Sequence, residues 1–407
     1  DKNTVTIEAE NENDKVEVTL EDVNIKTTGG KAAVSVTGKG DTTIELNGDN
    51  ELSGSGAHAA LEHNQTVDGE GNVTSGELTI QDKDKNGSLT ATGGIQNGAG
   101  IGAGGYHVSS GKIEITGGDI TAIGGKSAAG IGGSGRGDAD ITISGGTIRA
   151  TGGDQAAGIG GGTSGNGKVT ITGGAVIEES IGGSSGAGAT GGTGIGGGAG
   201  GHGTIDISGN AQVKNALGKD GGAGIGGGTW GDANIKITGD AVIKNATGGV
   251  FGAGIGGGGG RNGDVTISGN AKIENAQGGF TGSGIGGGNG ASGTVTIKDD
   301  STVTATGGEA GTGIGGGYAG LGDVTIEGNT TVNATGGVGS AGIGGGYGAE
   351  NDEDGNGNQI TIKSNESGSP TVNAVGGGTD ETEEIVIGGA GIGAGCESNA
   401  DTDIVLE

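Results

Sequence analysis

The sequence predicts an all-β fold: a single-stranded right-handed parallel β-helix, or β-solenoid, with three strands per coil and about 12 coils of ~28–30 residues. Three observations predict it. The phrase Gly-Ile-Gly-Gly-Gly recurs, and from Ile195 to Ile343 its isoleucines lie 30, 30, 30, 29 and 29 residues apart. Short alternating segments such as Val-Thr-Ile separate the phrases. Glycine is the commonest residue, with 112 of 407 positions.

The composition excludes other glycine-rich folds. Glycine does not fall at every third residue and there is one proline, so the chain is not collagen-like. The regular alternating segments disfavour disorder. Six aromatic residues and no methionine are too few for an ordinary globular core. Each coil is therefore expected to bury a small apolar stripe against its neighbours.

Each period contains three expected strands. The first is an apolar–polar–apolar triplet such as 141–143 or 235–237, because period-2 alternation of β-branched residues is the strand signal. The second starts at an apolar residue such as Ile148 and ends in an alanine before a Gly-Gly turn. The third is the glycine phrase, with its isoleucine in the core.

One continuous domain, 1–407, is expected because no proline- or serine-rich linker interrupts the pattern. It comprises less glycine-rich coils (1–96), regular glycine-phrase repeats (97–347) and C-terminal coils with acidic loops (348–407).

Three departures from the period predict protruding loops, at 182–193, 348–358 and 376–384. Insertions in a solenoid often carry binding, although a tolerated surface loop is an equal alternative.

The net charge of the chain limits its possible binding partners. There are 49 acidic and 20 basic residues, a formal charge of −29, so nucleic acid and anionic membrane surfaces are poor partners and divalent cations are plausible ones. No stretch is long and apolar enough for a membrane helix. Cys396 is the one cysteine, which excludes an internal disulfide and fits an exported bacterial protein.

The glycine phrase has two interpretations. If Ile159 points inward, strict alternation turns Gly158 and Gly160 outward, and the strand presents a bare, flat face for another solenoid or a polysaccharide. Alternatively the glycines serve turns and close backbone approach.

The aromatic residues are rare and similarly placed. Four follow their phrase isoleucine by four or five residues, and two precede it by four and five; Tyr318 and Tyr347, in successive coils, should stack. Exposed rings can stack on sugars, or they can cap the apolar stripe. The candidate ligand-binding residues are Tyr106, Trp230, Phe251, Phe280, Tyr318 and Tyr347.

Aspartates recur just before the triplet strands and in the loop 348–358. Stacked carboxylates repel unless a cation or turn amides compensate, so calcium is a candidate cofactor; the alternative is aspartate as an ordinary turn residue. The candidate calcium ligands are Asp138, Asp140, Asp232, Asp264, Asp323, Asp352 and Asp354.

Asn215, Asn245 and Asn275 occupy one place in three consecutive coils that carry an extra residue. They predict a structural asparagine ladder at a bend.

Enzymatic signals are weak. Asp206 and Lys236 should be neighbours, as a carboxylate and a base are in a polysaccharide lyase. Glycoside hydrolysis needs two carboxylates about 5–10 Å apart in a cleft, and no such pair is evident. We therefore expect no enzymatic activity.

Segments 18–25 (VTLEDVNI), 87–94 (GSLTATGG) and 141–148 (ITISGGTI) resemble the secreted carbohydrate-binding, adhesin-type β-helix proteins of Gram-positive bacteria. The resemblance implies a pectate-lyase-like right-handed β-helix without lyase activity, extracellular polysaccharide binding or surface adhesion, and calcium. No site residue is carried over from it.

The predicted function is that of an extracellular or cell-surface adhesin or polysaccharide-binding β-helix, whose partner is a polysaccharide or host glycan. The alternative is a stalk or fibre subunit that self-associates through its ends or its glycine face. A polysaccharide lyase is the third candidate.

Overall fold

A computed structural model describes residues 4–186, 189–378 and 387–407. In these ranges the chain forms 40 β-strands and no helix. Accordingly, the described chain contains no helix that is long and apolar enough to span a membrane.

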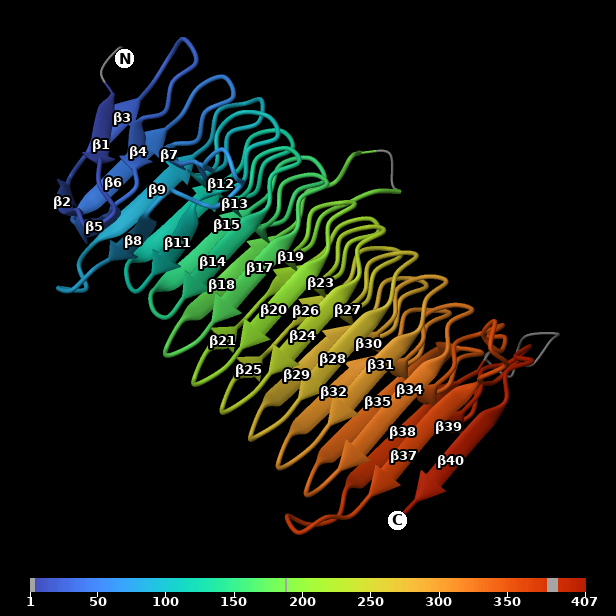
Figure 1. The fold of residues 1–407 in the computed structure, drawn as a ribbon. Coiled ribbons are helices and arrows are strands. Elements are labelled where there is room, and N and C mark those ends of the chain that lie inside the picture. Colours follow the sequence, from blue (N-terminus) through green and yellow to red (C-terminus); the bar gives the residue numbers. More distant parts are fainter. Residues whose placement is uncertain (1–3, 187–188, 379–386) are drawn as a thin grey trace.

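The strands form three parallel sheets, here called sheets A, B and C. Each coil contributes a strand to sheet B, then to sheet C, then to sheet A, and the coils stack along a rod (Figure 1). Twelve such coils run from β2 to β39; β1 precedes them in sheet A and β40 follows them in sheet B. The predicted parallel β-helix with three strands per coil is confirmed.

Sheet B contains the predicted triplets in register, for example Ile113 beside Ile141 and Ile205 beside Ile235. Its side chains alternate between the core and solvent because successive residues of a strand point to opposite faces. Its strands are β2 (Lys15–Glu21), β5 (Asp41–Asn47), β8 (Glu77–Gln81), β11 (Lys112–Ile115), β14 (Ala139–Ile143), β17 (Gly167–Ile171), β20 (Gly203–Ile207), β24 (Ala233–Ile237), β28 (Gly263–Ile267), β31 (Gly293–Ile297), β34 (Gly322–Glu327), β37 (Asn358–Lys363) and β40 (Thr402–Leu406).

Sheet C carries a bulge through four coils. The strand register shifts after Ile148 and shifts back after Ile273. Each coil from β18 to β29 therefore contains one extra residue in sheet C. The strands are β3 (Asn24–Lys26), β6 (Asp49–Ser53), β9 (Ser88–Thr92), β12 (Asp119–Ile123), β15 (Thr147–Thr151), β18 (Val176–Ile181), β21 (Gln212–Val213), β22 (Ala216–Leu217), β25 (Val242–Ile243), β26 (Ala246–Thr247), β29 (Lys272–Gln277), β32 (Thr302–Thr306), β35 (Thr331–Val338) and β38 (Thr371–Gly377).

The predicted asparagine ladder lies in this bulge. The Asn275 amide donates to the Asn245 side-chain oxygen at 3.3 Å, and Asn245 donates to the Lys214 carbonyl at 3.1 Å. Asn215 donates to Glu179 at 3.2 Å, so the ladder begins one coil earlier than predicted, on a glutamate.

Sheet A consists mainly of the glycine phrase. Its strands are β1 (Val5–Ala9), β4 (Val34–Gly38), β7 (Leu61–His63), β10 (Ile101–Gly102), β13 (Ile131–Gly132), β16 (Ile159–Gly160), β19 (Ile195–Gly196), β23 (Ile225–Gly226), β27 (Ile255–Gly256), β30 (Ile285–Gly286), β33 (Ile314–Gly315), β36 (Ile343–Gly344) and β39 (Ile392–Gly393).

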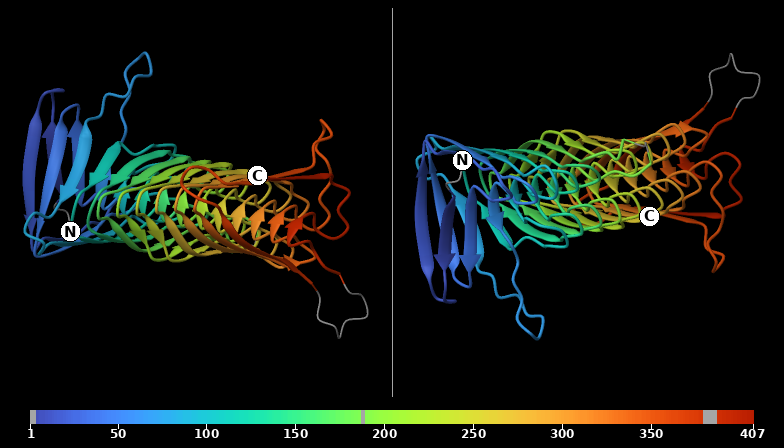
Figure 2. Two further views of the ribbon diagram at one scale, coloured as in Figure 1. Left: turned by 90° about the horizontal axis from the view of Figure 1, so that it is seen from below. Right: turned by 90° about the horizontal axis from the view of Figure 1, so that it is seen from above.

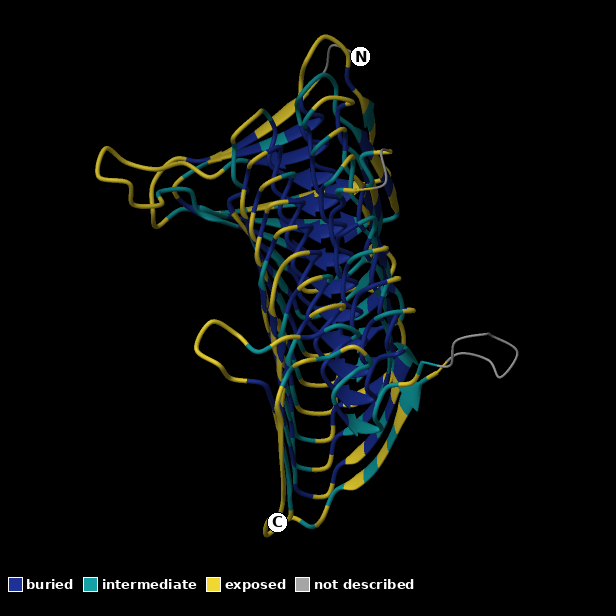
Figure 3. Cartoon of the chain, turned by 90° about the vertical axis from the view of Figure 1, so that its right-hand side faces the viewer, coloured by how far each residue is buried: buried dark blue, intermediate teal, exposed yellow. Residues whose placement is uncertain are grey.

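The main hydrophobic core runs through the coils from Ile7 to Ile360 (Figure 3), and a small second cluster consists of Ala59, Ala99 and Ala128. A typical coil supplies the phrase isoleucine, two triplet residues and one residue of sheet C, as in Ile159, Ile141, Ile143 and Ile148. Burying each such side chain contributes about 1.5–3 kcal/mol. Repetition of this small set along the rod compensates for the scarcity of aromatic residues.

The prediction of a bare outward glycine face is wrong. Gly158, Gly160, Gly197 and Gly226 are buried. The second phrase glycine has a φ of +136° at Gly160, and a Cβ there would overlap a carbonyl oxygen of the next coil. Because this backbone conformation is not that of an ordinary strand, alternation does not decide which side faces outward.

Two loops of each coil cover the phrase. Before it the chain leaves sheet C in one loop, and after it a second loop leads into sheet B; the Ala157 amide donates across the phrase to the Gly161 carbonyl at 3.0 Å. The second loop is also bonded to the first loop of the preceding coil: the Thr163 backbone amide donates to the Ser127 carbonyl at 3.0 Å. We call the surface formed by the tips of these two loops the loop edge, which lies at the upper right of the rod in Figure 1.

Other segments project from the rod. Residues 64–76 form a hairpin, here called the finger, with an antiparallel bridge between Val67 and Val73 (light blue in Figure 2). The spacing of the phrases did not single it out. Of the predicted loops 182–193 and 376–384, positions 187–188 and 379–384 lie outside the described residues.

Candidate functional site

The loop edge carries all six aromatic residues. Hydrogen bonds between coils align its second loops into two adjacent columns. One column holds residues with a φ of 54–87°; its members in successive coils are His107, Arg136, Ser164, Gly200, Trp230, Gly260, Gly290, Ala319, Gly348 and Glu397. The other column consists of the residue before each of these.

Tyr318 and Tyr347 stack as predicted. They occupy the same column in successive coils, and their rings lie 6.0 Å apart between centroids with an interplanar angle of 12°. The phenolic hydrogen bond of Tyr347 to the Glu397 carboxylate raises the pKa of Tyr347 to about 12.

Trp230 lies in the column of residues with positive φ, beside the column that holds Tyr318 and Tyr347. It has a φ of 61°, a conformation that favours glycine. Its ring lies over Gly260 of the next coil, where a Cβ would come within 3.2 Å of the indole. The side chain is nevertheless 58% exposed, so the ring covers a glycine and still faces solvent.

The two phenylalanines belong to the first loops of the edge. Phe280 is 53% exposed. The Thr281 backbone amide donates to the Val250 carbonyl, so Phe280 aligns with Val250, and Thr281 aligns with Phe251 of the preceding coil. In the same way, the Phe251 amide donates to the Asp220 carbonyl one coil earlier. Val250, which is also exposed, was not predicted; it follows a Gly-Gly pair and precedes Phe251, but its apolar class alone did not mark it.

The two loops bring these side chains close together. Asn289 donates to the Phe251 carbonyl at 2.8 Å, and Tyr318 donates to the Thr281 carbonyl at 2.8 Å. Trp230, Val250, Phe251, Phe280, Tyr318 and Tyr347 therefore lie on five consecutive coils of one edge. We call this set the aromatic strip.

Tyr106 lies apart, toward the N-terminal end of the same edge. Its ring packs edge-on against His107 at 4.2 Å between centroids, and the Arg136 guanidinium carbon lies 5.7 Å from its centroid. Three coils, whose phrase isoleucines are Ile131, Ile159 and Ile195, separate Tyr106 from Trp230, the first member of the strip.

The predicted calcium ligands occupy three different places. Asp138 and Asp232 belong to a ladder in which a side chain accepts the backbone amide of the equivalent residue one coil later, at 2.7–3.2 Å. The accepting residues of this side-chain ladder are Ser109, Asp138, Asn166, His202, Asp232, Asn262 and Ser292.

Three other candidates, Asp140, Asp264 and Asp323, share an outward column of sheet B, where Asp140 pairs with Lys168 at 3.0 Å. In the loop after β36, Asp352 accepts hydrogen bonds from the Asn356 side-chain amide and from the backbone amides of Asn356 and Asp354, and these bonds lower the pKa of Asp352. In the described ranges no three His, Cys, Asp or Glu side chains converge as metal ligands. Calcium binding stays a prediction.

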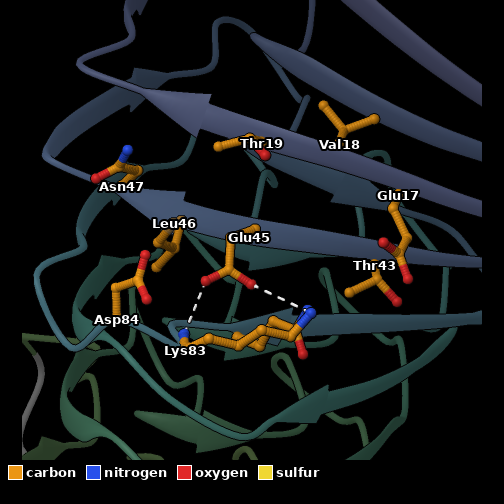
Figure 4. A pocket seen from close by; sticks show the side chains of 10 residues that line it. Glu17, Val18, Thr19, Thr43, Glu45, Leu46, Asn47, Lys83 and Asp84 are labelled. Carbon is orange, nitrogen blue, oxygen red and sulfur yellow. Dashed lines mark hydrogen bonds and ion pairs between the residues drawn. The ribbon is translucent and has the colours of Figure 1, made fainter.

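A polar hollow of about 490 Å³ lies elsewhere, on sheet B at β2, β5 and β8 (Figure 4). Glu45 lies at its centre and accepts the Lys83 amide at 2.7 Å, while its other oxygen lies 3.8 Å from the Lys83 ammonium. The hollow contains none of the predicted site residues, and its central carboxylate is already occupied by Lys83.

Asp206 and Lys236 are adjacent on sheet B, as predicted, and both are exposed. Their neighbours in the column are Thr170 and Thr266. This pair has no second carboxylate beside it in the column.

Comparison with known proteins supports the fold. A family model described as beta helix repeat matches residues 113–135, 141–163, 295–318 and 324–347. Each match begins at a strand of sheet B and ends in the second loop of the loop edge. With the three parallel sheets, this similarity supports a right-handed parallel β-helix. No curated protein and no solved structure matches the chain.

Proposed function

We propose that this β-helix is a non-catalytic, extracellular or cell-surface protein that binds polysaccharide along the aromatic strip, like the Gram-positive adhesin-type β-helices that its sequence resembles. The observation that carries the proposal is the gathering of the rare aromatic side chains at one edge, with Tyr318 stacked on Tyr347 and Trp230 and Phe280 more than half exposed. Exposed aromatic clusters of this kind are typical of binding surfaces.

The spacing of the strip suits a linear polymer. Coils repeat about every 4.8 Å, so one coil spans roughly one sugar residue. A polysaccharide chain lying along the rod would meet rings on successive coils. The formal charge of −29 favours neutral chains over anionic ones, because like charges repel.

A glycan array with the wild-type protein, with and without calcium, identifies the ligand. The double variant Tyr318→Ala/Tyr347→Ala should then bind it at least tenfold more weakly, about 1.4 kcal/mol, and remain folded. Tyr106→Ala is the matched control, since Tyr106 lies in the same column outside the strip. Equal binding by the double variant and the wild type would refute the proposal.

Self-association through the ends is the second candidate. Ile404 and Leu406 continue the core columns of Ile360 and Ile362, yet they are 43% and 71% exposed on β40. A second copy of the chain that packs end to end would cover them. Filaments that grow with concentration in electron micrographs, and vanish in Leu406→Lys, would favour this function over glycan binding by a monomer.

Calcium is part of the proposal as a stabilising ion, and a polysaccharide lyase centred on Asp206 and Lys236 is the third candidate. A melting temperature unchanged by chelator would argue against calcium. Release of unsaturated uronides, detected by their ultraviolet absorbance, would establish the lyase.

A further inference from the structure

A second group of exposed side chains lies at the N-terminal end of the loop edge, before the aromatic strip begins. It combines two apolar side chains with three that are basic, although the chain as a whole has a formal charge of −29. We call this group the basic patch; its exposed members are Ile95, Tyr106, His107, Lys126 and Arg136.

Backbone hydrogen bonds bring the two loops that carry the basic patch together. The Lys126 amide donates to the Ile95 carbonyl at 3.3 Å, so these two residues are neighbours in successive first loops. The Thr163 amide donates to the Ser127 carbonyl at 3.0 Å, and the Thr163 carbonyl accepts the Arg136 amide at 2.6 Å. Lys126 and Arg136 therefore belong to loops that meet at one residue of the next coil.

The Tyr106 ring lies between the basic side chains of the second loops. The Arg136 guanidinium carbon lies 5.7 Å from the ring centroid, and the His107 ring is edge-on to it at 4.2 Å. A Cβ at Gly135 would lie 3.1 Å from the Tyr106 ring and 3.0 Å from the Asn97 side-chain oxygen, so this glycine lets the ring approach the first loop of its own coil. The cation–π contact positions the guanidinium and leaves its N–H groups free to donate.

The charges of the basic patch are not neutralised by neighbouring carboxylates. Within the described residues, neither Lys126 nor Arg136 forms an ion pair. Asp138 follows Arg136 closely, but its carboxylate accepts the Asn166 amide at 2.7 Å. Asp154, in the first loop of the next coil, is exposed and pairs with neither cation. Charges more than about 8 Å away are screened at physiological salt, so an external anion meets mainly the cations of the basic patch.

We propose that the basic patch binds a phosphate group carried by a sugar or polyol of a surface polymer. A phosphate monoester has a charge near −2 and three strong acceptor oxygens. The Arg136 guanidinium, the Lys126 ammonium and the His107 imidazole can each contact a separate oxygen, whereas a carboxylate offers two. The carbon skeleton of the ligand packs on Tyr106 and on Ile95, which are 54% and 83% exposed. This surface is additional to the aromatic strip, which is proposed to bind neutral chains.

The test is a titration of the ¹⁵N-labelled full chain with D-glucosyl phosphate, inorganic phosphate, D-glucuronate and D-glucose. The amides of Tyr106, His107 and Arg136 should shift saturably with D-glucosyl phosphate, which should bind at least tenfold more tightly than each of the other three. Absence of a saturable shift with D-glucosyl phosphate, or equal binding of glucuronate, would overturn the proposal. Equal binding of inorganic phosphate would also overturn it, because free phosphate and not a phosphorylated carrier would then be the ligand.

Arg136→Gln tests the phosphate contact. The side chain is exposed, so the variant should keep its melting temperature and lose at least tenfold in affinity for D-glucosyl phosphate. Arg261→Gln is the matched control, since Arg261 is an exposed arginine of a second loop outside the basic patch, and it should bind like the wild type. Equal losses in both variants would mean that only the overall charge matters and would contradict the proposal.

Two further experiments separate this surface from other sources of phosphate binding. Tyr318→Ala/Tyr347→Ala should bind D-glucosyl phosphate like the wild type, and Arg136→Gln should bind the glycan identified on the array like the wild type. Loss of D-glucosyl phosphate binding in the double variant would place the phosphate on the aromatic strip and refute the basic patch. Co-sedimentation of the wild type, but not of Arg136→Gln, with phosphatidylglycerol vesicles would identify a lipid headgroup as the ligand and contradict a surface polymer.

Discussion

Sheet B and sheet A repeat with the same period, yet their residues face the core and the solvent by different rules. On sheet B, side chains at alternate positions point inward and outward, so Ile141 and Ile143 are buried and Thr142 between them is less so. In sheet A, both Ile159 and its flanking glycines are buried, because glycines with positive φ and two covering loops replace alternation. Repetition alone therefore does not say which side of a strand meets solvent.

Glycine substitutions should separate the two regions most strongly. Gly226→Ala places a Cβ at a φ of +141° against a carbonyl oxygen of the next coil, so we expect a loss of at least about 2–4 kcal/mol in the free energy of unfolding. Thr204→Ala on the outward face of sheet B should change it by less than about 0.5 kcal/mol. Urea unfolding of both variants measures the contrast; similar small losses would mean that the phrase is not closely packed.

The same contrast explains which features the sequence could predict and which it could not. The triplets of sheet B and the stack of Tyr318 on Tyr347 were predictable because each depends only on period and alternation. The burial of Gly158 was not, because it depends on backbone angles and on loops from neighbouring coils. The left-handed conformation of Trp230 was not predictable either, because nothing in the sequence marks this residue as having a positive φ.

The side-chain ladder was not predicted from the sequence, and the reason is different. Its members are serine, aspartate, asparagine and histidine, which share a hydrogen-bond acceptor and no residue identity. The aspartates alone were visible as a pattern, and they suggested a metal. Similarly, Glu179 begins the asparagine ladder but does not resemble Asn215.

Ladder substitutions should have the next largest effect. Asp232→Ala leaves the Asn262 amide without its acceptor, so we expect a loss of about 1 kcal/mol. Asp232→Asn keeps an accepting oxygen and should be nearly neutral. Thermal unfolding distinguishes the two variants. The control Asp264→Ala, on the outward column of sheet B, should stay within about 0.5 kcal/mol of the wild type.

A calcium role for Asp232 predicts another result. In that case Asp232→Asn would lose as much stability as Asp232→Ala, and the loss would disappear in chelator. That outcome would overturn the assignment of Asp232 to the ladder.

The smallest expected effect is on the ionisation of Tyr347. Glu397→Gln removes the carboxylate that raises the pKa of Tyr347 to about 12, so this pKa should fall toward its ordinary value of 10.0. Since the folded pKa is raised, the hydrogen bond stabilises the fold fully below about pH 10, and this contribution is lost as the pH rises through about 12. Ultraviolet titration of the tyrosines measures it. An unchanged titration curve would show that Glu397 does not hold the phenol.

The central claim is that glycan binds on the aromatic strip, and the most direct test uses Trp230, the sole tryptophan of the chain. Its ring is 58% exposed on the strip, so titration with an oligosaccharide identified on the array should shift its fluorescence emission to shorter wavelength, saturating at the affinity measured by calorimetry. Calorimetric binding without any change in Trp230 emission would place the ligand elsewhere and contradict the account.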